Sequence, residues 1–97
     1  MTSGPEAQRE QILDQPLYIG GANRPFRDVT LEGARARADE LRAATGFGPT
    51  ARVAPVARAW RELVIEMERS GAPTVGELDT SVVTALAPKL WVVMPGL

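Results

Sequence analysis

The segment from residue 53 to residue 70 carries the most regular helical pattern in the chain, and it constrains the fold more than any other feature. Its apolar residues recur at alternating spacings of three and four: Val53, Val56, Trp60, Leu63 and Met67. This spacing places them on one face of an α-helix. Pro55 is tolerated in a first helical turn, and Gly71 is a typical stop signal. We therefore expect a helix from about Pro55 to Ser70 whose apolar face needs covering.

Two further segments are predicted to be helical. The first begins near Asp28 or Thr30, either of which can cap it, and its apolar stripe follows the same spacing: Leu31, Ala34, Ala38, Leu41 and Thr45. The second opens at Thr74 and Glu77, which have the spacing of a capping box, and we expect it to end at Pro88.

These elements predict a mainly α fold in one domain, because a chain of 97 residues is too short for two separate cores. We expect a small three-helix domain over residues 16–97, formed by an αα-hairpin and a third helix. Residues 1–15 are small and polar and are predicted to be a flexible N-terminal segment. Residues 17–19 and 90–94 are strand-like, and pairing them gives a short two-stranded β-ribbon as an optional addition to the helices.

The composition excludes several classes of chemistry. The chain has no histidine and no cysteine, so thiol catalysis, Ser-His-Asp catalysis, zinc fingers and disulfides are ruled out. No loop has a calcium-binding or phosphate-binding pattern, and we expect neither a metal nor a cofactor. The net charge of −1 argues against a general electrostatic grip on nucleic acid or lipid. A non-enzymatic protein is favoured; a small enzyme using carboxylate and arginine chemistry is the second alternative.

The sequence also suggests an origin and a compartment. Arginine supplies ten of the eleven basic residues and alanine occurs 14 times, a bias typical of a GC-rich bacterial genome. The first residues lack the basic and apolar regions of a signal peptide. The longest apolar run, at residues 90–94, is far shorter than the roughly 20 residues that span a bilayer. We expect a cytoplasmic protein with no membrane association.

The loop around Gly20 and Gly21 is the first candidate site. Together with Asn23 and Arg24 it offers backbone N–H groups and a guanidinium to an anion. It matches neither the P-loop nor the dinucleotide-binding pattern, so an ordinary turn is the favoured interpretation.

The outer face of the helix at 55–70 is the second candidate. Ile65 points about 140° away from Trp60, off the buried stripe. The residues around Ile65 are charged and complete a set of interface candidates: Arg58, Arg61, Glu62 and Arg69. An apolar centre with a charged rim is typical of an interface.

We therefore expect a helical protein–protein interaction module or an accessory or regulatory subunit, whose partner is another protein or a second copy of itself. A degenerate helix-turn-helix regulator of nucleic acid is the first alternative. It is disfavoured because the helix after Thr74 offers Lys89 and a few hydroxyl groups but no Arg, Asn or Gln to read bases.

Overall fold

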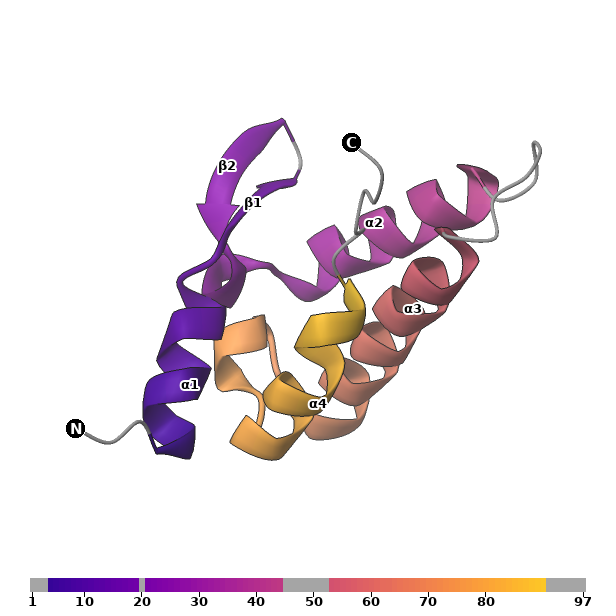
Figure 1. Cartoon of the computed structure of the whole chain (residues 1–97). Coiled ribbons are helices and arrows are strands. Elements are labelled where there is room, and N and C mark those ends of the chain that lie inside the picture. Colours follow the sequence, from indigo (N-terminus) through magenta and orange to yellow (C-terminus); the bar gives the residue numbers. More distant parts are fainter. Residues whose placement is uncertain (1–3, 20, 45–52, 91–97) are drawn as a thin grey trace.

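The computed structural model describes residues 4–19, 21–44 and 53–90. Within these ranges the helices are α1 (Pro5–Leu13), α2 (Leu31–Ala44), α3 (Val53–Ser70) and α4 (Thr80–Leu90). Two strands, β1 (Pro16–Ile19) and β2 (Ala22–Pro25), form an antiparallel hairpin, and two short 3₁₀ turns are η1 (Phe26–Asp28) and η2 (Val75–Glu77). The prediction of a mainly helical small domain is confirmed (Figure 1).

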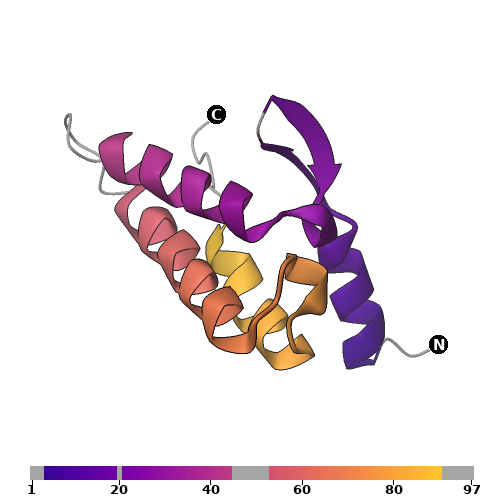
Figure 2. The ribbon, with the colours of Figure 1, turned by 180° about the vertical axis from the view of Figure 1, so that it is seen from behind.

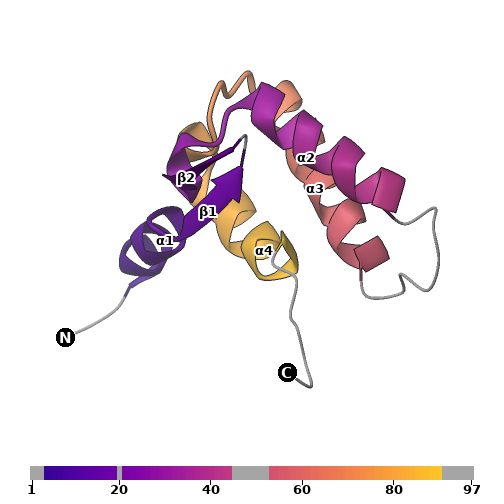
Figure 3. The same cartoon turned by 90° about the horizontal axis from the view of Figure 1, so that it is seen from above.

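The predicted αα-hairpin consists of α2 and α3, which lie side by side (Figures 1 and 3). Ala34 and Ala38 are buried in α2, and their small side chains allow a close approach of the two helices. Thr30 caps α2, as one of the two predicted alternatives: its hydroxyl oxygen accepts a hydrogen bond of 3.0 Å from the N–H of Gly33. At the C-terminus of α3, Gly71 has a φ of +69°, a conformation that suits glycine at a helix C-terminus.

Trp60 lies at the centre of the core and is fully buried. Its indole Nε1–H donates a hydrogen bond of 3.0 Å to the carbonyl oxygen of Leu90, at the end of α4. The guanidinium carbon of Arg37 in α2 lies over the indole ring, 5.8 Å from its centroid, which is a cation–π distance. The indole thus joins α2, α3 and α4.

Residues 1–15 do not stand apart from the domain along their whole length. Residues 5–13 form α1, which packs against α4 (Figure 1), and Leu13 is fully buried. The guanidinium of Arg9 donates hydrogen bonds of 2.9 Å to the carbonyl oxygens of Gly76 and Leu78. These long-range contacts place α1 in the packed domain, whereas the local sequence predicted a flexible segment.

The predicted ribbon between residues 17–19 and 90–94 is corrected by the structure. Residues 17–19 are in a strand, but β1 pairs with β2 in a register that matches Pro16 with Pro25 and Ile19 with Ala22. A strand two residues away is the nearest available partner, and Gly21, with a φ of +83°, suits the tight turn between them. Leu90 is the last residue of α4. Residues 91–94 lie outside the described residues.

The third predicted helix begins later and ends later than expected. Thr74 makes no side-chain capping hydrogen bond, so the capping box is wrong, and residues 75–77 form η2 instead. The helix starts at Thr80 and continues through Pro88 to Leu90. Buried packing of Leu90 and its hydrogen bond to Trp60 hold the last turn in place despite the missing proline N–H.

The two segments that precede α2 and η2 pair with each other (Figure 2). Thr30 and Thr74 form an isolated antiparallel bridge. The N–H of Val75 donates a hydrogen bond of 3.0 Å to the carbonyl oxygen of Val29, and the N–H of Leu31 donates one of 3.1 Å to the carbonyl oxygen of Pro73. This pairing connects the segment that enters α2 with the segment that leads from α3 to α4.

Candidate functional site

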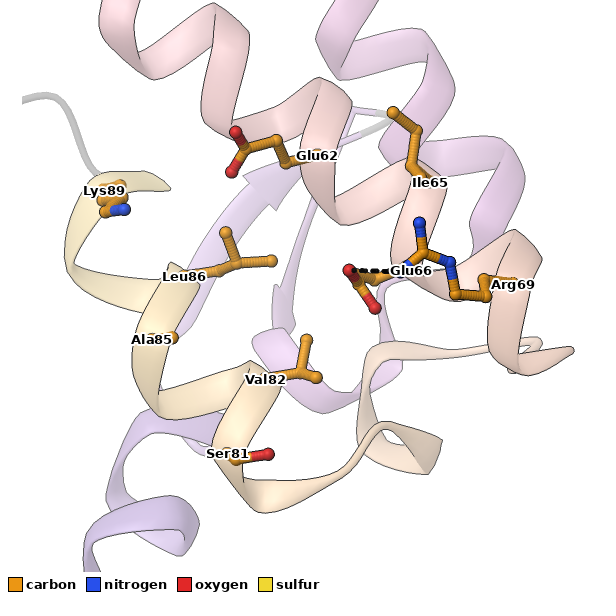
Figure 4. A pocket seen from close by; sticks show the side chains of 9 residues that line it. All are labelled: Glu62, Ile65, Glu66, Arg69, Ser81, Val82, Ala85, Leu86 and Lys89. Atoms are coloured by element: carbon orange, nitrogen blue, oxygen red, sulfur yellow. Dashed lines mark hydrogen bonds and ion pairs between the residues drawn. The ribbon is translucent and has the colours of Figure 1, made fainter.

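An open groove about 510 Å³ in volume lies between α3 and α4 (Figure 4). We call it the α3–α4 groove. Its walls come from both helices: Glu62, Ile65, Glu66 and Arg69 from α3, and Ser81, Val82, Ala85, Leu86 and Lys89 from α4. The structure therefore brings three of the predicted interface residues, Glu62, Ile65 and Arg69, to one feature of the surface.

The groove has an apolar α4 wall because α4 turns an apolar face toward α3. Val82 and Leu86 point into the groove (Figure 4), and both pack against the core. Ile65, on the α3 side, is 46% exposed and is not part of the buried core. The prediction that Ile65 lies off the buried stripe is confirmed. An apolar residue beside an apolar recess is the arrangement found at the centre of many interfaces.

The charges around the groove are only partly paired. Arg69 forms an ion pair of 3.5 Å with Glu66, one helical turn away. Among the described residues, neither Glu62 nor Lys89 has an oppositely charged group within 4.0 Å. Glu62 lies on the α3 wall and Lys89 on the α4 wall, so the groove carries one unpaired charge of each sign on opposite sides.

The other two predicted interface residues lie elsewhere. Arg58 and Arg61 line a smaller depression between α2 and α3, together with Arg42. Glu68, on the same helix, forms an ion pair with Arg35 across the αα-hairpin. The predicted interface set is therefore split between two sides of α3.

The glycine loop is the turn of the β-hairpin. Gly21 is exposed, while Asn23 and Arg24 are exposed residues of β2; Gly20 lies outside the described residues. Arg24 has no ion pair with any residue that the structure describes. These positions agree with an ordinary hairpin turn.

Sequence reasoning did not include Lys89, Val82 and Leu86 in the candidate site. Val82 and Leu86 both pack against the core. Their second role, as one wall of the groove, depends on the crossing of α3 and α4, which no local pattern records. The only available signal was the apolar spacing of Val82 and Leu86 together with a lone lysine one turn further along.

The exposed residues of α4 are Ser81, Ala85, Pro88 and Lys89, which present a single cation. In the described ranges, no three acidic residues lie close enough to hold a metal ion. None of the helices there is both long enough and apolar enough to cross a membrane.

Comparison with known proteins gives no relative. No protein-family model, no curated protein and no solved structure matches the chain.

Proposed function

We propose that this domain is a protein–protein interaction module that associates with a second copy of itself through the α3–α4 groove. The observation that carries the proposal is the position of Ile65, an exposed apolar side chain at the edge of an apolar recess. Because Ile65 is 46% exposed, burying the rest of it in a partner stabilises a complex by roughly half of the about 1.5–3 kcal/mol that full burial of an isoleucine contributes.

The charge pattern supports a second copy as the partner. A two-fold interface uses the same surface on both subunits, so each group must meet a complementary group of the other copy. Glu62 and Lys89 have opposite signs, lie on opposite walls and lack partners among the described residues. In a two-fold dimer, each Glu62 faces the Lys89 of the other copy, and each Ile65 enters the other groove.

The size of the domain also supports association. A small chain buries a modest share of its surface, and oligomerisation commonly adds to the stability of such domains. The groove remains open in a single copy, with Val82 half-buried on one wall. Covering this wall removes further apolar surface from water.

Sedimentation equilibrium at tens of micromolar tests the proposal. We expect the wild type to form dimers and Ile65→Asp to be monomeric, because a buried carboxylate in the interface has no partner. Tyr18→Asp is the matched control, since Tyr18 is, among the residues that the structure describes, the other large apolar residue that is exposed (63%), and it lies on the β-hairpin. It should dimerise like the wild type.

Two results contradict self-association. One is a monomeric wild type over the whole concentration range, which would assign the groove to a different protein. The other is an Ile65→Asp variant that dimerises as strongly as the wild type. Circular dichroism of each variant checks that an altered mass is not caused by unfolding.

A further inference from the structure

The depression between α2 and α3 has a composition unlike that of the α3–α4 groove. It has a volume of about 130 Å³ and is lined by alanine and arginine alone: Ala38, Arg42, Ala54, Ala57, Arg58 and Arg61. We call it the arginine depression. Alanine side chains leave its floor open, and guanidinium groups from two helices surround it.

Arg58 and Arg61 differ from most of the arginines that the structure describes. Five arginines in the described ranges form ion pairs with carboxylates: Arg9, Arg27, Arg35, Arg37 and Arg69. Arg58 and Arg61 form none with the residues that the structure describes, although Glu62 is four residues from Arg58. They lie three residues apart on α3, where like charges repel each other. An anion placed between them relieves that repulsion.

We propose that the arginine depression binds one phosphate group, either as inorganic phosphate or as a phosphate monoester of a small molecule. Guanidinium groups donate paired N–H bonds that match the oxygens of a phosphate. The volume is below the range of roughly 300–1,000 Å³ that is typical of pockets for whole organic ligands. The depression therefore suits a single anionic group and leaves the rest of a larger ligand in solvent.

The observations favour a single phosphate group over a nucleic acid. Nucleic-acid binding requires a row of cations that follows successive phosphates. On the described surface of α3, Glu62 interrupts the positive charge immediately after Arg61, and Glu66 follows one turn later. The proposal does not depend on self-association, because the arginine depression faces α2 rather than α4.

Titration with potassium phosphate against potassium chloride of equal ionic strength tests the site. Amide chemical shifts and the melting temperature report binding. We expect saturable shifts around the arginine depression and a higher melting temperature in phosphate for the wild type. The double variant Arg58→Gln/Arg61→Gln should bind phosphate about tenfold more weakly or not at all. Arg24→Gln removes an exposed arginine of β2 that forms no ion pair with a described residue, and this variant should respond like the wild type.

The comparison arms identify the source of the phosphate. Binding of inorganic phosphate alone indicates the free ion, and equal binding of O-phosphoserine indicates a monoester; both results support the site. An equal response to phosphate and chloride, or an unchanged response in the double variant, overturns it. Binding of a single-stranded oligonucleotide without binding of phosphate overturns it in favour of nucleic acid.

A stability measurement separates binding from a structural role of the two arginines. Without phosphate, the urea midpoint of the double variant should equal or exceed that of the wild type, because the repulsion between Arg58 and Arg61 is removed. A lower midpoint would mean that the arginines stabilise the fold itself, which contradicts the proposal.

Discussion

The indole nitrogen of Trp60 donates a 3.0 Å hydrogen bond to the backbone carbonyl oxygen of Leu90, and both residues are buried. The last carbonyl groups of a helix have no donor within that helix. The indole of α3 supplies one for α4 and so fixes the angle between the two helices that enclose the groove.

Replacing Trp60 with phenylalanine tests this connection. Trp60→Phe keeps an aromatic ring in the core but leaves the buried carbonyl of Leu90 without its donor. We expect the free energy of unfolding to fall by about 1–3 kcal/mol. Urea denaturation measures it; an unchanged midpoint would show that the hydrogen bond contributes nothing.

The two faces of α3 should respond differently to truncation. Leu63 is 1% exposed, so Leu63→Ala is expected to cost about 2–5 kcal/mol. Ile65→Ala is the control on the same helix, and at a concentration where the protein is monomeric it should change stability by no more than about 0.5 kcal/mol. Equal losses in the two variants would mean that the buried face of α3 is misassigned.

The α2–α3 hairpin was predictable because its spacing of apolar residues and its caps are local signals. The stripe of Val56, Trp60 and Leu63 is buried as predicted, and Thr30 caps α2. The prediction that α4 ends at Pro88 was wrong, because long-range packing of the last turn outweighs the local cost of a proline there.

The N-terminal helix was underestimated for a similar reason. Arg9 bonds to Gly76 and Leu78, which are 67 and 69 residues away, and no local pattern contains such contacts. The exposed position of Ile65 followed from helical geometry alone. The α4 wall of the groove, which includes Lys89, depends on how α4 crosses α3, so it could not be predicted from the sequence of either helix alone.

Arg9 provides a direct test of the attachment of α1. Arg9→Gln shortens the side chain and removes charged donors from two carbonyl groups, so we expect a loss of about 1.5–3 kcal/mol. Amide hydrogen exchange in residues 5–13 should increase more than elsewhere. Unchanged exchange in this segment would show that α1 is held by apolar contacts alone.

The contacts of Arg27 predict a pH range over which the contribution of Arg27 to the stability of the fold is constant. The hydrogen bonds that the guanidinium donates to the carboxylate of Asp14 and, with a smaller effect, to that of Glu10 raise the pKa of Arg27 above its ordinary value. A raised pKa stabilises the fold at every pH below the pKa of the unfolded state, and the effect is lost only as the pH rises through the folded value.

Wild type and Arg27→Gln should therefore differ in stability by the same amount from about pH 6 to about pH 10, where arginine stays protonated in both states. Urea midpoints at intervals across this range measure the difference. A difference that shrinks steadily between about pH 8 and about pH 10 would contradict the assignment to Arg27.

The proposed pairing of Glu62 with Lys89 of a second copy is tested most directly by mixing two charge-reversed variants. In Glu62→Lys and in Lys89→Glu, like charges meet at both ends of the dimer, so each variant alone should be monomeric where the wild type is dimeric. In a one-to-one mixture, opposite charges meet at both ends again, and sedimentation equilibrium should show a dimer. A mixture that stays as monomeric as its components, or variants that each dimerise like the wild type, would contradict the two-fold interface.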